Sequence, residues 1–264
     1  MPKEAKDNSV PGIATGVAFY YLDANKKGAL LPSSKTLDDK DQAIAYTLNQ
    51  FYSKQKDPDV MHIMYNDEPY NSTSSASLLD MLLSNRAETI QFGHTKATQL
   101  YFNKPDIYAS QLPIKMASDI PQLAQQGEPY TSTVTLTTKG GANFISFAKT
   151  NQFNNDLYDG LVAQALKADL IAETWRRGSE VPLGCSLTYH TNDALTIQVG
   201  ATQEFKYTKD HSKIARSTDP SKPWVCIGDV NRMTSQYIRG GGTECFSSTF
   251  VWQAFNVIKD ENMC

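Results

Sequence analysis

The stretch YTKDHSKIARSTDPSKPW, residues 207–224, contains the triplet His-Ser-Lys at residues 211–213. An earlier stretch, FGHTKATQLYF, residues 92–102, contains His-Thr-Lys at residues 94–96. The chain has only four histidines, so half of them stand two residues before a lysine. Each half of the chain thus carries one imidazole and one ammonium at the same spacing.

Both triplets lie in strand-like surroundings, where residues two apart project to the same side, roughly 6.5–7 Å from each other. We therefore expect His94 to project beside Lys96, and His211 beside Lys213. A neighbouring ammonium disfavours protonation of an imidazole and binds phosphate oxygens. Brought together, two such pairs would let one ring attack phosphorus while the other protonates the leaving oxygen, with no metal ion. Chance repetition is the alternative, and periodicity alone does not decide between them.

The distribution of apolar residues predicts a single unit of mixed α/β class, because strand and helix patterns alternate without a low-complexity linker. We expect strands over residues 16–24, 59–70, 88–102, 132–138 and 194–213. We expect helices over residues 38–54, 142–175 and 249–258.

Composition limits the classes of function. The chain has 264 residues, a net charge of −3 and a pI of about 5.8, so it lacks the basic surface typical of nucleic-acid binding at neutral pH. Near pH 5 the histidines gain charge and some carboxylates lose it, so a polyanionic partner suits acid conditions better. No apolar run is long enough to span a bilayer. The start, MPKEAKDNSVPG, is not a signal peptide, which predicts a cytosolic protein or a numbering that begins after a removed segment.

The four cysteines all lie in the C-terminal third and form no C-x-x-C pair, so the usual zinc and redox spacings are absent. A cysteine at the last residue favours disulfides that tie down the tail, and hence an oxidising compartment. Four cysteines allow three pairings. The one glycosylation sequon begins at Asn71, in a serine-rich stretch that predicts a surface loop.

Several blocks carry a resemblance to a known family. DHSK, PWVCIGDVNR and RGGGTECF closely resemble the C-terminal signature of the deoxyribonuclease II family of acid endonucleases. YNDEP, GHTK, TLTTKGGANFISFAK and DLYDGLVAQAL resemble further blocks of that family in the same order. The resemblance runs from about Gly16 to Cys264.

The resemblance implies a phospholipase D-like fold, with two αβ halves related by a pseudo-twofold and packed around a central cleft. The first half, about residues 1–140, would supply His94 and Lys96, and the second, about 141–264, His211 and Lys213. The implied reaction is metal-independent hydrolysis of DNA at acid pH through a phosphohistidine, leaving 3′-phosphate ends. No cofactor is implied.

The resemblance also implies roles for individual residues. His94 corresponds to the nucleophile and His211 to the general acid, although the reverse order remains open. Lys96 and Lys213 would bind the phosphate, and the amide of Asn231 would hydrogen-bond to phosphate or to an imidazole. The implied disulfides are Cys185–Cys264 and Cys226–Cys245. Double-stranded DNA, contacted through its backbone, is the implied partner; the implied location is lysosomal or secreted and not membrane-bound, and a homodimer suits the family.

This sequence departs from the family pattern in two places. The chain begins at Met1 where the family has a secretion signal and a strand. After Lys104 it passes directly to PDIYASQLPIK, which resembles a block much further along. The missing strands would leave an edge unpaired. Two alternatives therefore stay open: a catalytically impaired secreted paralogue that binds DNA or another polyanion, and a phosphodiesterase for other substrates.

Other polar residues have simpler interpretations. We expect His62 to be a core or strand histidine, and His190, at a strand end, to be structural or exposed. Arg176 and Arg177 are expected to be surface charges, with contact to a DNA backbone as the alternative. The RGGGTE segment from Arg239 lacks the remainder of a phosphate-binding loop, and we expect it to form a tight turn between Cys226 and Cys245.

Overall fold

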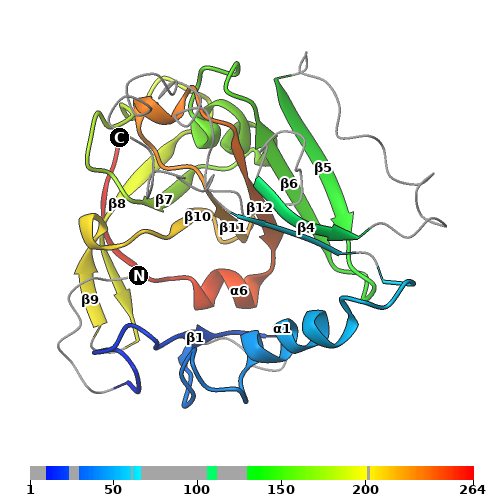
Figure 1. The fold of residues 1–264 in the computed structure, drawn as a ribbon. Helices are drawn as coiled ribbons and strands as arrows, with labels where there is room; N and C mark the ends of the chain where they lie inside the picture. Colours follow the sequence, from blue (N-terminus) through cyan, green and yellow to red (C-terminus); the bar gives the residue numbers. More distant parts are fainter. Residues whose placement is uncertain (1–9, 24–29, 61, 67–105, 112–129, 201–202) are drawn as a thin grey trace, which may run out of the picture.

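The computed structural model describes residues 10–23, 30–60, 62–66, 106–111, 130–200 and 203–264 (Figure 1). Three of the predicted residues, His94, Lys96 and Asn71, lie outside the described residues. His211, Lys213, Asn231 and all four cysteines lie within them.

Before residue 150, the described chain forms one helix and six strands, four of which make two separate two-stranded sheets. They are β1 (Tyr20–Tyr21), β2 (Leu31–Pro32), α1 (Ala43–Lys54), β3 (His62–Asn66), β4 (Asp106–Gln111), β5 (Thr131–Thr137) and β6 (Asn143–Lys149). Those that follow are the π-helical turn η2 (Tyr158–Val162), α5 (Ala163–Leu166), β7 (Leu170–Thr174), β8 (Thr191–Val199), β9 (Gln203–Lys206), η3 (Tyr207–Lys209), β10 (Lys213–Ser217), β11 (Trp224–Gly228), η4 (Thr234–Gln236), β12 (Gly241–Ser247), α6 (Thr249–Ala254) and β13 (Ile258–Asn262).

One nine-stranded sheet dominates the described part of the chain. Its order is β13-β8-β7-β10-β11-β12-β6-β5, and β9 also pairs with β8. β7 and β8 run parallel, whereas the other neighbouring strands run antiparallel. β5, which precedes the predicted boundary near residue 140, is an edge strand of this sheet. The predicted α/β class is thus confirmed, with much more sheet than helix.

The hydrophobic core lies on one face of this sheet. Phe147, Ala172, Ala215 and the Cys226–Cys245 disulfide pack there against the helical segment 157–166. The opposite face carries Val225 and Ile227 and is lined by α6 and the β1 segment, which Figure 1 shows below the sheet. The helical segment and the disulfide thus hold the central strands, β7 and β10 to β12, from one side.

The helix predicted over residues 38–54 is present as α1, but it begins later, at Ala43. The side chain of Gln42 caps it by accepting a hydrogen bond from the Ile44 amide at 2.6 Å. The acidic residues 38, 39 and 41 therefore precede the first turn and do not form it. β5 likewise lies where a strand is predicted, and the predicted C-terminal helix is shorter, ending at Ala254 before β13.

The prediction of one long helix over residues 142–175 is wrong at both ends. Residues 138–142 form the turn of a β-hairpin, in which Gly141 adopts a positive φ of 83°, and the chain returns as β6. The last part is β7, every residue of which is buried. A strand buried on both faces has a continuous apolar run and no alternation, so its pattern resembles that of a buried helix. Only the middle, residues 158–166, is helical, and it ends at Lys167 in the left-handed conformation.

The structure holds two disulfides, Cys185–Cys264 and Cys226–Cys245, the same pairs that the family resemblance implies. The first joins the C-terminal residue to the loop before β8. The second joins directly opposed residues of β11 and β12 inside the core. No helix in the described ranges is both long and apolar enough to cross a membrane.

Candidate functional site

His211 lies in a short loop between η3 and β10, and not in a strand as predicted. The carboxylate of Asp210 accepts hydrogen bonds from the amide of Ser212 at 3.0 Å and from its hydroxyl at 2.7 Å. Such local bonds compete with strand pairing and form a turn. The expected side-by-side projection of His211 and Lys213 along one strand therefore does not occur.

Lys213 is the first residue of β10 and is buried, with 6 % of its surface exposed. Its ammonium turns back and donates a hydrogen bond to the carbonyl oxygen of His211 at 2.7 Å. The side chain of Lys213 is thus bonded to the backbone of His211. This contact fixes the loop relative to the sheet.

The ring of His211 stacks on that of Trp175, the residue directly after β7. The ring centroids are 4.5 Å apart and the planes are inclined by 27°. Trp175 also lies near Arg177, whose guanidinium carbon is 5.7 Å from the centre of the indole ring. Aromatic stacking of this kind restricts the imidazole to a narrow range of orientations.

The amide of Asn231 is buried, with 7 % exposure, in the loop after β11. Within the part of the chain that the structure describes, its side-chain oxygen has no hydrogen-bond partner. A buried amide oxygen without a partner is costly, so such an atom marks a position where a polar group from a ligand or another segment belongs.

Sheet topology brings these residues to one end of the central strands. β10 begins where its antiparallel neighbours β7 and β11 end, with Lys213 opposite Thr174 and Ile214 opposite Ile227. The loop before β10 therefore meets the segments after β7 and β11. His211, Lys213, Trp175 and Asn231 come from these three segments.

Glu173 is an unpredicted acidic group at this end of the sheet. It pairs with Ile214, has 1 % of its surface exposed, and neither carboxyl oxygen has a hydrogen-bond partner among the described residues. Burial raises the pKa of Glu173 to about 9, and the nearby carboxylate of Asp210 adds to the rise. The Glu173 side chain is therefore neutral in acid and at neutral pH.

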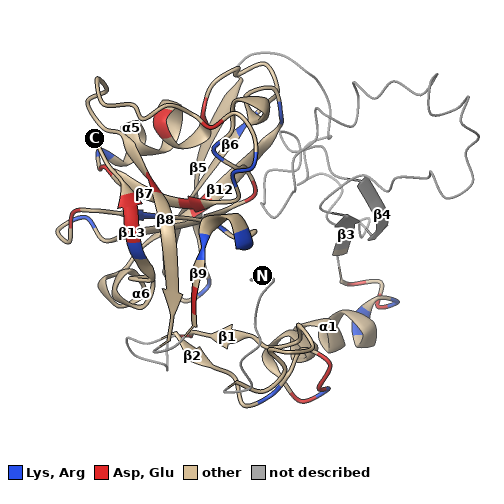
Figure 2. Ribbon diagram, turned by 90° about the vertical axis from the view of Figure 1, so that its left-hand side faces the viewer, with Lys and Arg blue, Asp and Glu red and all other residues tan. Residues whose placement is uncertain are grey.

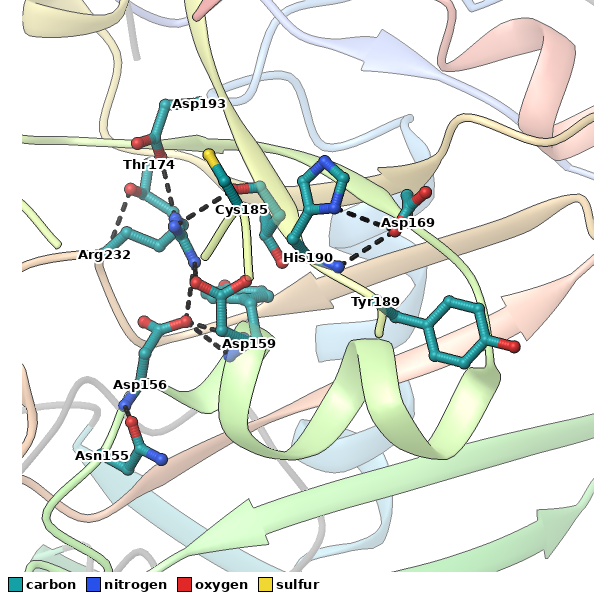
Figure 3. Close-up of polar contacts among 12 residues, drawn as sticks. Asn155, Asp156, Asp159, Asp169, Thr174, Cys185, Tyr189, His190, Asp193 and Arg232 are labelled. Atoms are coloured by element: carbon teal, nitrogen blue, oxygen red, sulfur yellow. Dashed lines mark hydrogen bonds and ion pairs between the residues drawn. The ribbon is translucent and has the colours of Figure 1, made fainter. Parts of the chain in front are cut away.

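A buried ionic network lies behind the site and is centred on Arg232, the residue after Asn231. Figure 3 shows three carboxylates converging on its guanidinium: Asp156 at 2.7 Å, Asp193 at 2.8 Å and Asp159 at 3.0 Å. The Arg232 amide also donates to the hydroxyl of Thr174 at 3.1 Å. Burial raises the pKa of the Asp156 and Asp193 carboxyls, and the guanidinium charge opposes that rise. The network joins the segment after β11 to the end of β7.

Lys149, at the end of β6, anchors the neighbouring loop. Its ammonium donates to the carbonyl oxygens of residues 236, 237 and 239 at 2.9, 3.0 and 2.7 Å. Three acceptors require three N–H groups, so the geometry fits the protonated lysine, while burial lowers its pKa to about 8. All three hydrogen bonds are therefore available at acid pH.

Charge on the described part of the chain is mixed. Figure 2 shows lysines and arginines interspersed with aspartates and glutamates, which agrees with the absence of a basic surface in the sequence at neutral pH. Among the described residues, no group of three or more His, Cys, Asp or Glu side chains is arranged to hold a metal ion.

The other predicted residues have structural positions. His190 bonds Asp169 through both its ring nitrogen and its amide, at 3.2 and 3.0 Å (Figure 3). His62 begins β3 and meets the ring of Phe51 edge-on. These contacts suit structural roles for both residues.

The prediction of a surface charge at Arg176 is wrong. Arg176 is 1 % exposed and donates to the carbonyl oxygens of Thr174 and Ala194.

The glycines of RGGGTE also differ from expectation, because the segment continues into β12. A Cβ on Gly242 would lie 2.2 Å from the Phe147 carbonyl oxygen, so close strand packing and not a turn requires glycine there.

Comparisons with known proteins decide the family. A sequence model described as Deoxyribonuclease II matches residues 1–98 and 87–264. Deoxyribonuclease-2 of Caenorhabditis elegans is 48 % identical over 334 aligned positions, which cover 100 % of this chain and 89 % of that protein. This chain belongs to the deoxyribonuclease II family.

Other proteins match at lower identity. Plancitoxin-1 of Acanthaster planci is 30 % identical over 305 positions, which cover 97 % of this chain and 85 % of that protein. Deoxyribonuclease-2-alpha of Sus scrofa is 39 % identical over 167 positions, which cover 60 % of this chain and 45 % of that protein.

The alignments contain an internal discontinuity. The 334 aligned positions of the nematode relative exceed the 264 residues of this chain, so about 70 of them face a gap here. The two segments that match the deoxyribonuclease II family meet at residues 87–98, around the first triplet and close to the discontinuity predicted after Lys104. This chain therefore lacks a part that its relative has.

Sequence reasoning missed Trp175, Glu173 and Arg232. Glu173 interrupts an apolar run in DLIAETW, and a charge inside a buried strand is a detectable signal. Arg232 follows Asn231 directly in GDVNR. Nothing in the sequence places Trp175 beside His211, because only the pairing of β7 with β10 brings them together.

Proposed function

We propose that this protein is an endodeoxyribonuclease that cleaves DNA at acid pH without a metal ion, through a phosphohistidine, and leaves 3′-phosphate ends. The observation that most supports this is the position of His211, Lys213 and Asn231 at one end of the sheet, in a chain of the deoxyribonuclease II family. We assign the first triplet, His94 and Lys96, to the same cleft, in a phospholipase D-like arrangement of two halves divided near residue 140.

In the first step, an imidazole nitrogen of His94 forms a bond to phosphorus while the bond from phosphorus to the 5′ oxygen breaks. His211 gives its proton to that oxygen, and the departing strand carries a 5′-hydroxyl. Lys96 and Lys213 bind the non-bridging oxygens and stabilise their charge, a role that a metal ion has in other nucleases. The amide of Asn231 makes a further hydrogen bond to the phosphate or to an imidazole.

In the second step, His211 removes a proton from water, and the water oxygen attacks phosphorus. The phosphorus–nitrogen bond to His94 breaks, and the product strand keeps a 3′-phosphate. The two histidines exchange roles if the order is reversed. Acid conditions suit this scheme because an ordinary imidazole is mostly protonated at pH 5, so the group that serves as the acid carries its proton.

Plasmid nicking tests the proposal. The wild-type protein in EDTA at pH 5 should convert supercoiled plasmid to open-circular and linear forms, and His211→Ala should lower the rate about 10³-fold or more. His190→Gln is the matched control, because His190 contacts Asp169 away from the loop of His211. Kinase should label the new 5′ ends directly, and polymerase should extend the 3′ ends only after phosphatase. Absence of nicking, or equal rates for wild type and His211→Ala, would refute the proposal.

A second candidate is a paralogue that binds DNA or another polyanion without turnover. The excess of about 70 aligned positions in the relative favours it, because the two segments that match the family model meet around the first triplet. This candidate predicts salt-dependent binding of duplex DNA at pH 5 with no nicking at any protein concentration.

We place the protein in the lysosome or outside the cell, because its two disulfides persist in oxidising compartments.

We also propose glycosylation of Asn71 and assembly as a homodimer around duplex DNA. A mobility shift on endoglycosidase treatment tests the glycosylation, with Asn71→Gln as control. Sedimentation analysis of the purified protein tests the dimer.

A further inference from the structure

Two adjacent arginines at the end of β7 have opposite environments. Arg176 is held inside the protein by two carbonyl oxygens and by Asp193, whose carboxylate lies 3.7 Å away. Arg177 is exposed, and no carboxylate pairs with it among the residues that the structure describes. The Arg176 side chain therefore stabilises the folded structure, whereas the charge of Arg177 faces solvent.

Arg177 is close to the site because it shares Trp175 with His211. Its guanidinium carbon lies 5.7 Å from the indole centre, and the His211 ring centre lies 4.5 Å from the same ring. The guanidinium carbon is therefore at most about 10 Å from the centre of the His211 imidazole.

This upper limit includes the phosphates next to the one that reacts. Successive phosphates on one strand advance about 3.4 Å along the helix axis, so a reach of up to about 10 Å covers a phosphate one, two or three nucleotides from a given one. An exposed guanidinium binds phosphate oxygens through a planar pair of N–H donors. Because the proposed function assigns Lys96 and Lys213 to the phosphate that reacts, the exposed guanidinium of Arg177 is left for a flanking phosphate.

We propose that Arg177 binds a DNA phosphate one, two or three nucleotides from the phosphodiester that is cleaved, with Trp175 setting its distance from His211. This contact rests on the proposed function. It accounts for binding of a polyanion by a chain with a negative net charge, since the cation is placed locally and not spread over a basic face.

Two substrates separate this contact from catalysis. A thymidine dinucleotide has a single phosphodiester and no flanking phosphate, whereas a 12-base-pair duplex has flanking phosphates on both sides. Arg177→Gln should raise KM for the duplex about two- to fivefold at low salt, the effect of one exposed ion pair, and should leave kcat and KM for the dinucleotide unchanged. Arg177→Lys should restore most of the duplex affinity. Lys139→Gln is the control, because Lys139 is exposed in the hairpin turn at the far end of β6.

Binding provides a second readout that does not need turnover. In a His94→Ala background, the slope of log Kd against log salt for the duplex should fall by about 0.9 on adding Arg177→Gln, the loss of one phosphate contact. An unchanged slope, or an equal loss of activity on both substrates, would overturn the proposal. If the wild type cleaves nothing but Arg177→Gln still lowers the slope, the proposed nuclease function fails and the phosphate contact stands.

Discussion

The imidazole of His211 stacks on the indole of Trp175, with ring centroids 4.5 Å apart and planes inclined by 27°. The carbonyl oxygen of the same histidine accepts a hydrogen bond from the Lys213 ammonium at 2.7 Å. The ring of His211 is thus positioned from β7, and its backbone from β10. These contacts give a histidine in a loop the fixed orientation that the proton transfer proposed for it requires.

Removing the stacking surface should lower activity without removing any group that contacts substrate. We expect Trp175→Ala to reduce kcat for plasmid at pH 5 about 10- to 100-fold, because a misplaced acid transfers its proton poorly. Trp175→Phe keeps an aromatic face and should lose less than about tenfold. Steady-state kinetics with both variants check this, and circular dichroism confirms that each is folded. Equal kcat values for the alanine variant and the wild type would show that stacking does not position the histidine.

Arg232 should contribute more to stability than any exposed arginine in this chain. Arg232→Met leaves Asp156 and Asp159 buried without a cation and Asp193 with only the more distant Arg176, which should lower the free energy of unfolding at pH 7 by about 3–5 kcal/mol. Arg177→Gln, the matched exposed control, should change it by less than about 0.5 kcal/mol. Urea denaturation measures both. A loss below about 1 kcal/mol for Arg232→Met would contradict the role given to the network.

Glu173 should make the wild type less stable as pH rises. Its folded-state pKa of about 9 lies above the ordinary value of 4.5, so the stability that its neutral form provides is complete below pH 4.5 and declines as pH rises toward 9. The decline amounts to at most about 1.4 kcal/mol per pH unit. Glu173→Gln cannot ionise, so its melting temperature should rise relative to wild type between pH 5 and 8. If the melting temperatures of the variant and the wild type change equally with pH across that range, Glu173 does not carry a proton in the folded protein.

Helix and strand patterns predicted the fold only where one face of an element meets solvent. The helix α1 and the strand β5 both have alternating or periodic apolar residues, and both lie where the sequence places them. β7 is buried along its whole length and was predicted as helix, because the apolar run Leu170–Ala172 shows no alternation and so does not distinguish the two. Local patterns therefore failed in the strand that supports the site.

Part of the candidate site was predictable as a set of residues, but its arrangement was not. The triplet at residues 211–213 and Asn231 are recognisable from sequence blocks, and so are both disulfide pairs. The loop conformation of His211 depends on the hydrogen bonds that Asp210 makes to Ser212, which strand periodicity does not reveal. The opposite environments of Arg176 and Arg177 depend on tertiary contacts, since the residues are adjacent and identical in type.

The central claim, that histidines from both triplets act on one phosphorus atom, is tested most directly by trapping the covalent intermediate. A substrate with sulfur in place of the bridging 5′ oxygen needs no proton for its leaving group. His211→Ala should therefore form the adduct and fail to hydrolyse it. We predict that alkaline quenching and peptide mass spectrometry will find a nucleotide on His94 in His211→Ala and none in His94→Ala. With reversed roles, the nucleotide appears on His211 in His94→Ala. Cleavage by the wild type with no adduct on either histidine in either variant would contradict the account.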